Sequence, residues 1–506
     1  MSRRLQDIRT ADLCTDRAVR EFLRVQGGRL ECVVAADGTV FAVSGGLSRR
    51  VGRALLGLVH GSLGAARLVE VTPLDFAQWK EANRPRLGAI PAASRNPANR
   101  TVEFVFGRAV EERASDVYLD VRLDRAMLAF RTYGFRRPFD QLSRDDGLAL
   151  ARSIWALGTN AQFDESGVCD VAFDFEHGGR QYRIRGNSMK EVRGNSVVCR
   201  VRDPSFVLPL EDSGYAPVQV RQIARMCRAP GGLILITGET NSGKSTTLAS
   251  LMSGLPTTQK VIEVADPVEV LMDHVSHIEI EHYGEGTAQR LNQNLAALVR
   301  QNPDTLVLGE IRDGPSATAA KDMAIQGKRV LTTLHSQSCA AAIPRLVNLG
   351  VPMPLLGARA FLAGIVNQNL VPVVCGSCGL ASHPDAAVDA RYRTLFGESV
   401  RFLNRAGCGD CRGGVAGQTL VAEVYPLCLD RTGRANELIG AGRVAELERH
   451  MRRNGAGGNG CMSKHQHAAT KAAVGQIDPE HTERIIGEFN GEDVEGRCGD
   501  LVELGR

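Results

Sequence analysis

The sequence predicts an α/β protein whose main domain is built on a mostly parallel sheet, and two observations support this class. From Gly231 onward, short runs rich in β-branched residues (LILITG, VIEVAD, TLVLGE and RVLTTLH) are separated by longer helical stretches. This alternation is typical of a parallel sheet covered by helices on both faces. A glycine-rich segment follows the first of these strands and opens a helix, which indicates a phosphate-binding loop at the carboxyl edge of the sheet.

Length and composition limit the classes of protein that fit. The chain has 506 residues, enough for about three domains, and its 43% hydrophobic and 23% charged residues are ordinary for a globular protein. A net charge of +4 and only 5% aromatic residues argue against a nucleic-acid translocase. No apolar run approaches the roughly 18 to 20 residues of a membrane span, and no signal peptide is readable. We therefore expect a cytoplasmic chain, unless a partner carries it elsewhere.

Two proline-containing breaks, 91–99 and 203–218, divide the chain. Between them, strand-like stretches alternate polar and apolar residues, as in a small α+β domain with an antiparallel sheet. After about Leu427 the chain becomes helical and polar, and NGAGGNG at 454–460 is expected to form a flexible joint. The expected parts are 1–99, without a chemical motif; 100–205, the small α+β domain; 206–427, the parallel-sheet domain; and 428–506, the helical C-terminal domain and tail.

The strongest motif is the segment GETNSGKS, which begins at Gly238 and has the P-loop pattern. Chance supplies about 0.03 such matches in a chain of this composition, and the strand before it and the helix at 244–252 fit the expected context. We expect Lys244 to reach the β and γ phosphates of a nucleotide and Ser245 to bind Mg²⁺. The predicted nucleotide-binding residues are Gly238, Glu239, Thr240, Asn241, Ser242, Gly243, Lys244, Ser245 and Thr246.

Three further strands end in polar residues. The run TLVLGEIRD ends an apolar strand at Glu310, where a carboxylate can orient and deprotonate the water that attacks the γ phosphate. A helix cap or surface acid is the alternative. In VIEVADPVE, the acids Glu263, Asp266 and Glu269 can hold Mg²⁺-bound water, or they form a solvated turn. The run RVLTTLH ends at His335, which can sense the γ phosphate or be a structural or surface histidine.

Four cysteines form two CxxC pairs, Cys375 with Cys378 and Cys408 with Cys411, separated by 29 residues. An odd total of 13 cysteines in a large cytoplasmic chain argues against a disulfide framework. Four thiolates satisfy tetrahedral Zn²⁺ and close the site to water, so the predicted zinc is structural. The intervening segment is expected to be a protruding lobe clamped at its base; four incidental thiols are the alternative.

The P-loop, the acidic run, the Glu310 run and the His335 run follow one another along the chain, and in this order they resemble the secretion ATPase superfamily that powers type II secretion and type IV pilus assembly. Its four boxes read here GETNSGKSTT, VIEVADPVE, RQNPDTLVLGEIRD and AIQGKRVLTTLHSQSCAAAIPRLVNLG. The middle-domain segment ASDVYLDV is similar to the family's ASDIHIEP, and the assembly-type members carry two CxxC pairs at the same point. The resemblance covers about 100–490. It implies a RecA-like P-loop core, a PAS-like α+β domain before it, and ATP, Mg²⁺ and structural Zn²⁺ as cofactors.

The resemblance also implies a function. Family members are hexameric ATPases that act on pilus assembly or type II secretion through an inner-membrane platform protein, so a homo-hexamer peripheral to the inner membrane is expected, without direct nucleic-acid binding. Arg183, Arg185 and Arg200 match family arginines that approach the bound nucleotide and are the expected catalytic arginines. The shortened arginine stretch also resembles type IV secretion and conjugative thin-pilus ATPases, which is the alternative within the class.

Four positions depart from the family pattern, and two of them, Tyr118 and Lys328, stand where the family has histidines. Ala265 stands where the family has the first acid of its acidic box, so the metal role falls to Asp266 or Glu269. Glu239 stands where most relatives have proline and adds a negative charge beside the phosphate loop. Because of Ala265, a nucleotide-binding scaffold that does not hydrolyse ATP is a further alternative.

Overall fold

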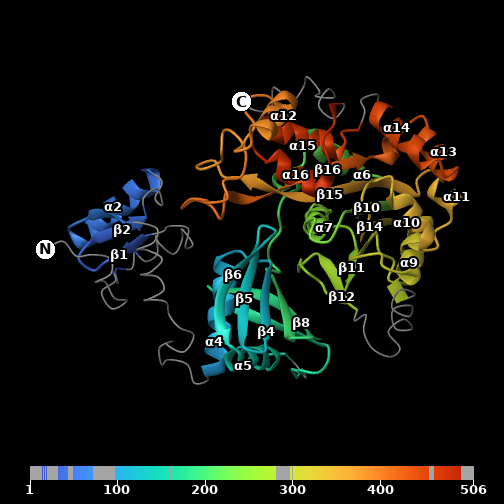
Figure 1. Ribbon diagram of the computed structural model, residues 1–506. Coiled ribbons are helices and arrows are strands. Elements are labelled where there is room, and N and C mark those ends of the chain that lie inside the picture. The colour runs from blue at the N-terminus through green and yellow to red at the C-terminus, as the bar shows by residue number, and fades with distance from the viewer. Residues whose placement is uncertain are drawn as a thin grey trace. The chain divides into compact units, whose positions relative to one another are not determined.

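The computed structural model describes residues 14, 16, 19, 32–43, 49–71, 97–158, 162–280, 297–298, 300–454 and 461–491. Contacts divide the chain into two compact units (Figure 1). Unit 1 comprises Met1–Asp203, Val374–Leu380 and Leu403–Gly417, and unit 2 comprises Pro204–Val373, Ala381–Phe402 and Gln418–Arg506. Of the expected joint at 454–460, Asn454 ends helix α14 and the remainder lies outside the described residues.

The first part of unit 1 is a three-stranded sheet in the order β1-β2-β3. Strand β1 is antiparallel to β2, and β2 is parallel to β3, so the helix between β2 and β3 forms the crossover. Val40, Leu55 and Val59 are fully buried and belong to one small core. The elements are β1 (Cys32–Val34), β2 (Thr39–Val43), α2 (Arg49–Leu63) and β3 (Arg67–Val71).

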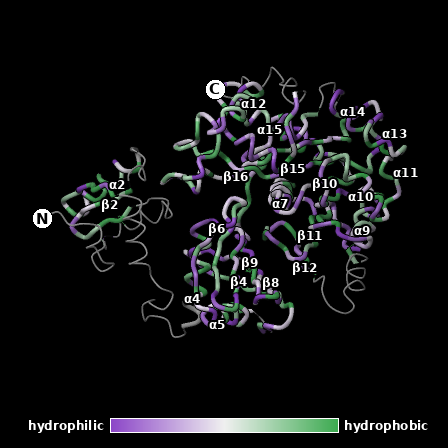
Figure 2. Tube along the Cα trace, in the orientation of Figure 1, coloured by the Kyte–Doolittle hydropathy of each residue, from purple (hydrophilic) through white to green (hydrophobic). Residues whose placement is uncertain are grey.

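The second part of unit 1 is a six-stranded antiparallel sheet in the order β6-β5-β4-β9-β8-β7. Buried and more exposed residues alternate along β8 and β9, and Figure 2 shows a matching alternation of hydrophobic and hydrophilic residues along this sheet. One face of the sheet therefore packs on the helices, where Phe106 and Trp155 are fully buried. The elements are α4 (Pro97–Glu111), β4 (Asp116–Arg122), β5 (Arg125–Thr132), β6 (Phe135–Ser143), α5 (Arg144–Trp155), β7 (Cys169–His177), β8 (Arg180–Glu191) and β9 (Gly194–Arg202).

Unit 2 is built on a seven-stranded sheet in the order β12-β11-β13-β14-β10-β15-β16. The pairings from β12 to β15 are parallel. Strands β10 and β14 are buried at every position, which is why most of their residues are apolar or β-branched. The strands are β10 (Gly232–Thr237), β11 (Val261–Ala265), β12 (Val275–Glu279), β13 (Thr305–Leu308), β14 (Arg329–Leu334), β15 (Leu362–Val374) and β16 (Val415–Tyr425).

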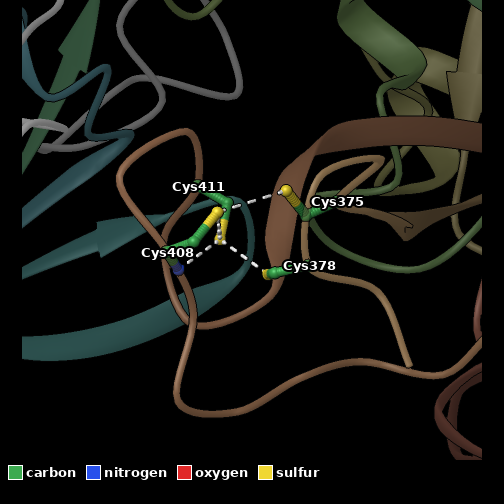
Figure 3. A group of neighbouring side chains, drawn as sticks. All are labelled: Cys375, Cys378, Cys408 and Cys411. Carbon is green, nitrogen blue, oxygen red and sulfur yellow. Dashed lines mark hydrogen bonds between the residues drawn. The ribbon is translucent and has the colours of Figure 1, made fainter. Parts of the chain in front are cut away.

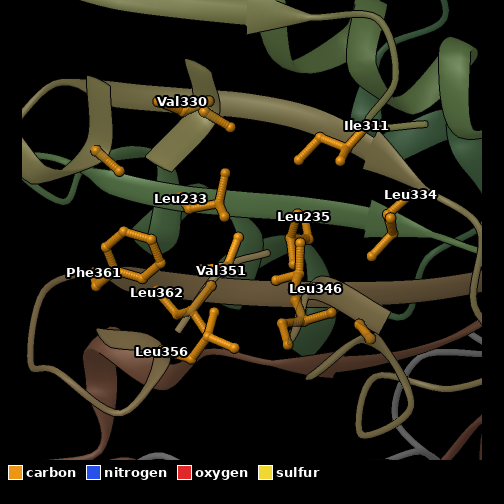
Figure 4. Close-up of a cluster of buried hydrophobic side chains, with 14 of the residues drawn as sticks. Leu233, Leu235, Ile311, Val330, Leu334, Leu346, Val351, Leu356, Phe361 and Leu362 are labelled. Atoms are coloured by element: carbon orange, nitrogen blue, oxygen red, sulfur yellow. The ribbon is translucent and has the colours of Figure 1, made fainter. Parts of the chain in front are cut away.

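A large apolar core covers one face of this sheet. Figure 4 shows Leu233 and Leu235 of β10 and Val330 and Leu334 of β14 gathered with Leu346 of α10. Together the units confirm the predicted fold class, a mostly parallel α/β core preceded by a small α+β domain and followed by helices. The helices of unit 2 are η3 (Leu210–Ser213), α6 (Pro217–Cys227), α7 (Lys244–Ser253), α9 (Gly314–Ile325), α10 (Ala342–Asn348), α11 (Met353–Leu356), α12 (Ala386–Phe396), η4 (Leu427–Leu429), α13 (Arg434–Gly440), α14 (Val444–Asn454), α15 (Lys464–Ala473) and α16 (Pro479–Ile486).

Side chains from two helices satisfy the backbone of β16, the last strand in the sheet order. On α15, His467 Nδ1 accepts from the Ala422 amide at 3.1 Å, and Lys471 Nζ donates to the Leu420 carbonyl at 2.8 Å. On α6, Gln219 donates to the Ala422 carbonyl at 2.7 Å. These contacts protect an edge that would otherwise be open to pairing with another strand.

Segment boundaries differ in detail from those expected. Helix α4 begins at Pro97, inside the predicted break at 91–99, and the break at 203–218 contains η3 and runs into the start of α6. The cysteine-bearing segments Val374–Leu380 and Leu403–Gly417 group with unit 1, although the sequence suggested the domain that forms unit 2. Among the described residues, no helix has both the length and the apolar character that a membrane span requires.

Candidate functional site

The phosphate-loop segment runs from the end of β10 to the start of α7 (both green in Figure 1). Gly238 has φ 147°, and a Cβ there would lie 2.3 Å from the carbonyl oxygen of Gln368. Gly243 has φ 84° and forms the left-handed N-cap of α7. Only glycine fits both positions without strain, so the loop's backbone can turn tightly in front of a helix N-terminus.

Gln368 of β15 holds this loop from the neighbouring strand. Its Nε2 donates to the Ser242 carbonyl at 2.8 Å, and its Oε1 accepts from Tyr215 Oη at 2.5 Å and from Thr247 Oγ1 at 3.0 Å. Gln368 is fully buried, so these hydrogen bonds anchor the phosphate loop to the interior of the domain. Sequence reasoning missed Gln368, Tyr215 and Thr247. The available signal was the polar run NQN inside an otherwise apolar strand, LAGIVNQNLVPVV.

The predicted nucleotide-binding side chains differ in exposure along the loop. Glu239, Thr240 and Asn241 are exposed, whereas Ser245 and Thr246 are half-buried in the first turn of α7. Ser242 is 3% exposed, and its Oγ has no hydrogen-bond partner in the described part of the chain. A buried, unsatisfied hydroxyl inside a glycine-lined loop is the feature expected where a phosphate oxygen binds.

Lys244 is buried at the start of α7, and its Nζ donates to the carbonyls of Gly238 at 3.0 Å and Glu239 at 2.7 Å. Burial lowers the pKa of Lys244 below its ordinary value. Three carboxylates act in the opposite direction and raise that pKa, namely Glu310, Glu239 and Glu269. The ammonium therefore lies in a partly desolvated site with acids around it, where a phosphate would compete for its hydrogens.

Glu310 follows β13 and is held on both oxygens. Its Oε1 lies 2.9 Å from His335 Nε2, and its Oε2 accepts from Arg312 Nε at 2.7 Å. Strands β13, β14 and β10 are neighbours, so Glu310, His335 and the phosphate loop follow adjacent strands at the carboxyl edge of the sheet. The helix-capping role belongs to Asp313, whose Oδ1 accepts from the Ser316 amide at 2.9 Å. Sequence reasoning assigned no role to Arg312.

His335 directly follows β14, and its side chain is 44% exposed. Burial lowers the pKa of His335, the charge of Lys244 lowers it further, and Glu310 partly offsets both effects. The imidazole is therefore neutral near pH 7 and can share a hydrogen bond with Glu310.

The acids after β11 divide into two groups. Glu263 is 4% exposed within the strand, and its Oε2 lies 2.6 Å from Nδ1 of His277 on the neighbouring strand β12. Nε2 of the same ring lies 2.9 Å from the Met272 amide and 3.2 Å from the Met272 carbonyl, so both ring nitrogens of His277 have partners. Asp266 and Glu269 follow the strand, and Glu269 lies near enough to act on the pKa of Lys244.

The predicted catalytic arginines lie in unit 1. Arg185 of β8 is paired in register with Arg200 of β9, and Arg200 with Asp116 of β4. Arg200 Nε lies 3.4 Å from Asp116, which is 3% exposed, and Arg183 Nε lies 3.3 Å from Asp174. Register and alternation therefore place these arginines on the face of the sheet opposite the helices, where acids such as Asp116 and Asp174 also lie.

The four predicted zinc ligands converge. Figure 3 shows Cys375 and Cys378 from one turn facing Cys408 and Cys411 from another, and all four sulfurs lie within 4.8 Å of one another. Three of the Sγ separations are 3.8, 3.6 and 3.8 Å. A tetrahedral zinc with Zn–S bonds of about 2.3 Å places its sulfurs about 3.8 Å apart, so the donor set fits this metal.

The backbone around the cluster also suits a metal centre. The amides of Cys408 and Gly414 donate to Sγ of Cys411 at 3.2 and 3.3 Å. Burial raises the pKa of the free Cys408 thiol to about 11, so metal binding would have to displace its proton. Arg412, next to Cys411, forms an ion pair with Glu112 at 3.3 Å within unit 1.

Comparison with known proteins agrees with these features. The sequence profile of the family described as Type II/IV secretion system protein matches residues 92–471. Type II secretion system protein E of Pseudomonas aeruginosa is 30% identical over 365 residues, which are 71% of this chain and 70% of that protein. The Protein transport protein HofB homolog of Escherichia coli is 31% identical over 373 residues, 72% of this chain and 77% of its own length. The Type IV pilus assembly ATPase PilB of Thermus thermophilus is 28% identical over 407 residues, 79% of this chain and 44% of that protein.

Two solved structures share the fold. The Legionella pneumophila ATPase DotB superposes with a TM-score of 0.54 at 19% identity, covering 78% of this chain and 98% of that chain. The pilus retraction motor PilT with bound ADP gives a TM-score of 0.51 at 22% identity with the same coverage. The phosphate loop, the strand-end residues and the match to residues 92–471 lead to one conclusion: this chain belongs to the type II/IV secretion system protein family.

Proposed function

We propose that this protein hydrolyses ATP as the motor of a pilus-assembly or type II secretion system. One observation carries the proposal: Glu310 is held between His335 and Arg312, on strand ends adjacent to the glycine loop and Lys244. An oriented carboxylate beside a phosphate-binding loop is the arrangement that positions water for phosphoryl transfer. The names of relatives in pilus assembly and type II secretion support the choice of motor.

Each residue of the site has a proposed role. The loop amides and Lys244 bind the β and γ phosphates, and the Ser242 hydroxyl gains the acceptor that it lacks. Ser245, with Asp266 or Glu269 through water, would hold Mg²⁺, whose chemistry is to neutralise phosphate charge. A carboxylate oxygen has two lone pairs, so Glu310 can keep His335 and Arg312 while it accepts a hydrogen bond from water.

The assembly is part of the proposal. A homo-hexamer would repeat one interface around a ring, and arginines from the exposed sheet face of unit 1 would meet the charge that develops on the γ phosphate. Arg183, Arg185 and Arg200 are the proposed residues. The motor would act in the cytoplasm on an inner-membrane platform protein, with the four cysteines holding a structural Zn²⁺.

Phosphate release by the purified full-length chain tests this proposal, with Glu310→Gln as the matched variant. We expect magnesium-dependent turnover in the wild-type protein and a loss of about 100-fold or more in the variant. Nucleotide binding without turnover in the wild-type chain would instead favour a non-hydrolysing scaffold, and stimulation by DNA would favour a translocase.

A further inference from the structure

Lys464, in the first turn of α15, reaches out of the helical tail into the core of unit 2. Its Nζ donates to the Gln337 carbonyl at 3.0 Å, to Asn367 Oδ1 at 2.9 Å and to Asn369 Oδ1 at 2.8 Å. Three donors meet three acceptors, so the ammonium is fully satisfied. Asn367 and Asn369 are both buried and lie on the same face of β15.

The contacts of Asn367 continue from Lys464 to the candidate site. Its Nδ2 donates to the Ser336 carbonyl at 3.0 Å and to Thr237 Oγ1 at 2.9 Å. Ser336 directly follows His335, and Thr237 is the last residue before the phosphate loop. One amide therefore joins the two strand ends that carry the histidine and the loop.

Lys464 determines which way this amide points. An ammonium only donates hydrogen bonds, so it requires Oδ1 of Asn367 on its own side and leaves Nδ2 for the Ser336 carbonyl. If the amide turned over, Oδ1 would face that carbonyl and two acceptors would repel. Thr237 can accept from Nδ2 because its own hydroxyl donates to the Val366 carbonyl at 2.9 Å.

Burying the ammonium group of Lys464 costs solvation free energy, which its contacts must offset. Burial lowers the pKa of Lys464, and the carboxylates of Glu423 and Glu239 act in the opposite direction. Glu423 is 5% exposed and accepts from the Cys339 amide at 2.6 Å. The segment between His335 and Cys339 is thus held at one end by Asn367 and Lys464 and at the other by Glu423.

We propose that Lys464 is a positioning residue for the hydrolytic site: it orients Asn367, which holds the turn after His335 and thereby the partner of Glu310. The expected change in kcat rests on the proposed ATPase function. The expected change in the structure of the turn after His335 does not depend on that function. The C-terminal helical tail would then contribute directly to turnover.

Lys471 provides a matched control on the same helix. Its Nζ also donates to three oxygens, those of the Gly214 carbonyl at 2.7 Å, Thr419 Oγ1 at 2.6 Å and the Leu420 carbonyl at 2.8 Å. None of these acceptors belongs to the segment after His335. Lys464→Met and Lys471→Met therefore each remove one amino group from the same helix. Only Lys464→Met removes a contact to the segment that follows His335.

Hydrogen exchange of a peptide spanning 335–341, measured on the full chain, tests the structural step. We expect Lys464→Met to accelerate exchange there by about tenfold, while Lys471→Met leaves this peptide unchanged and lowers the melting temperature. Asn367→Ala should reproduce most of the Lys464→Met effect. The double variant should be less affected than the sum of the two single variants, because the two residues share the Lys464–Asn367 contact, although Lys464 also holds the Gln337 carbonyl directly. Equal exchange in Lys464→Met and wild type would overturn the proposal.

Steady-state kinetics test the functional step. We expect kcat to fall about tenfold in Lys464→Met while nucleotide affinity changes less than about threefold, because the loop and Lys244 are retained. Lys464→Arg, which keeps the charge and the donors, should recover most of the loss. An unchanged kcat in Lys464→Met would contradict this step. A wild-type chain without turnover would refute the proposed ATPase function, and the exchange experiment would still decide the role of Lys464.

Discussion

At the candidate site, Lys244 is expected to bind the nucleotide, and Glu310 is expected to act only in its hydrolysis. Lys244→Ala removes the charge that would meet the β and γ phosphates, and hydrogen bonds to charged groups contribute about 1.5 to 3 kcal/mol each. We therefore expect nucleotide affinity to fall about 100-fold. Glu310→Gln keeps the side chain's shape, so affinity should change less than about threefold while kcat falls by a factor of roughly 10² to 10⁴.

Binding of a fluorescent ATP analogue and phosphate release measure the two quantities separately. Lys260→Ala is a suitable control, because Lys260 is an exposed lysine at the opposite end of β11 from the acids. Equal loss of affinity in Lys244→Ala and Glu310→Gln would show that Glu310 contacts the phosphates rather than water.

His335 gives the site a predicted acid limit. Burial and the charge of Lys244 lower the pKa of His335 below its ordinary value of 6.5, so the ring is neutral at pH 7 and gains a proton only as pH falls below that value. The protonated ring would bind Glu310 as an ion pair and compete with water for its oxygen. We expect kcat to decline below about pH 6.5, and a pH profile of His335→Gln, which cannot titrate, should lack this limb. An identical acid limb in His335→Gln would assign it to another group.

At the level of secondary-structure elements, the ends of the strands could be predicted from the sequence. The side-chain hydrogen bonds between elements that are distant in the sequence could not. The runs before Gly238, Glu310 and His335 are mostly apolar or β-branched because their strands are buried on both faces, so the sequence pattern indicates where each strand ends. The two CxxC pairs were equally readable, since each pair lies in one turn. The orientation of Gln368 and the donation from Lys464 depend on neighbours more than ninety residues away, which no local pattern reports.

The cysteine cluster is predicted to hold one Zn²⁺ per chain. Cys408→Ser removes one of four ligands, so metal content should fall from about one to near zero after dialysis. The bound metal would join the Leu403–Gly417 segment to the turn that carries Cys375 and Cys378, in addition to the ion pair between Arg412 and Glu112. We therefore expect loss of the metal to accelerate proteolytic cleavage within Leu403–Gly417. Binding of ATP to unit 2 should be retained.

Cys428→Ser serves as the control for this measurement, because Cys428 is exposed and is not one of the four clustered thiols. It should retain full zinc content. Wild-type protein purified without chelator and found free of zinc would contradict the assignment.

The arginine face of the six-stranded sheet is predicted to act in turnover rather than in folding. Arg185 is exposed on β8, so Arg185→Ala should change the melting temperature little and lower kcat by roughly 10² or more if the guanidinium meets transition-state charge. Arg152→Ala is the matched control, because Arg152 is 60% exposed on α5, on the helical side of the same sheet. Similar kinetics for both variants would remove the sheet face from the mechanism.

At the scale of the whole molecule, the phosphate loop and the arginine face belong to different compact units. In the proposed ring, every interface would repeat the same two surfaces, and an arginine of one chain would complete the site of its neighbour. Two inactive variants then complement each other: Arg185→Ala retains Glu310, and Glu310→Gln retains Arg185. Sites formed by the first chain and completed by the second would be active.

In a one-to-one mixture, half of the chains retain Glu310, and half of those have a neighbour that retains Arg185. Random assembly should therefore restore about one quarter of wild-type activity per chain, although each variant alone is nearly inactive. Phosphate release after the two purified variants are dissociated, mixed and reassembled measures this recovery, and size-exclusion chromatography with light scattering confirms that rings have formed. Mixed rings that stay as inactive as the separate variants would mean that the arginine acts within its own chain, because then every chain carries a defect that no neighbour can repair.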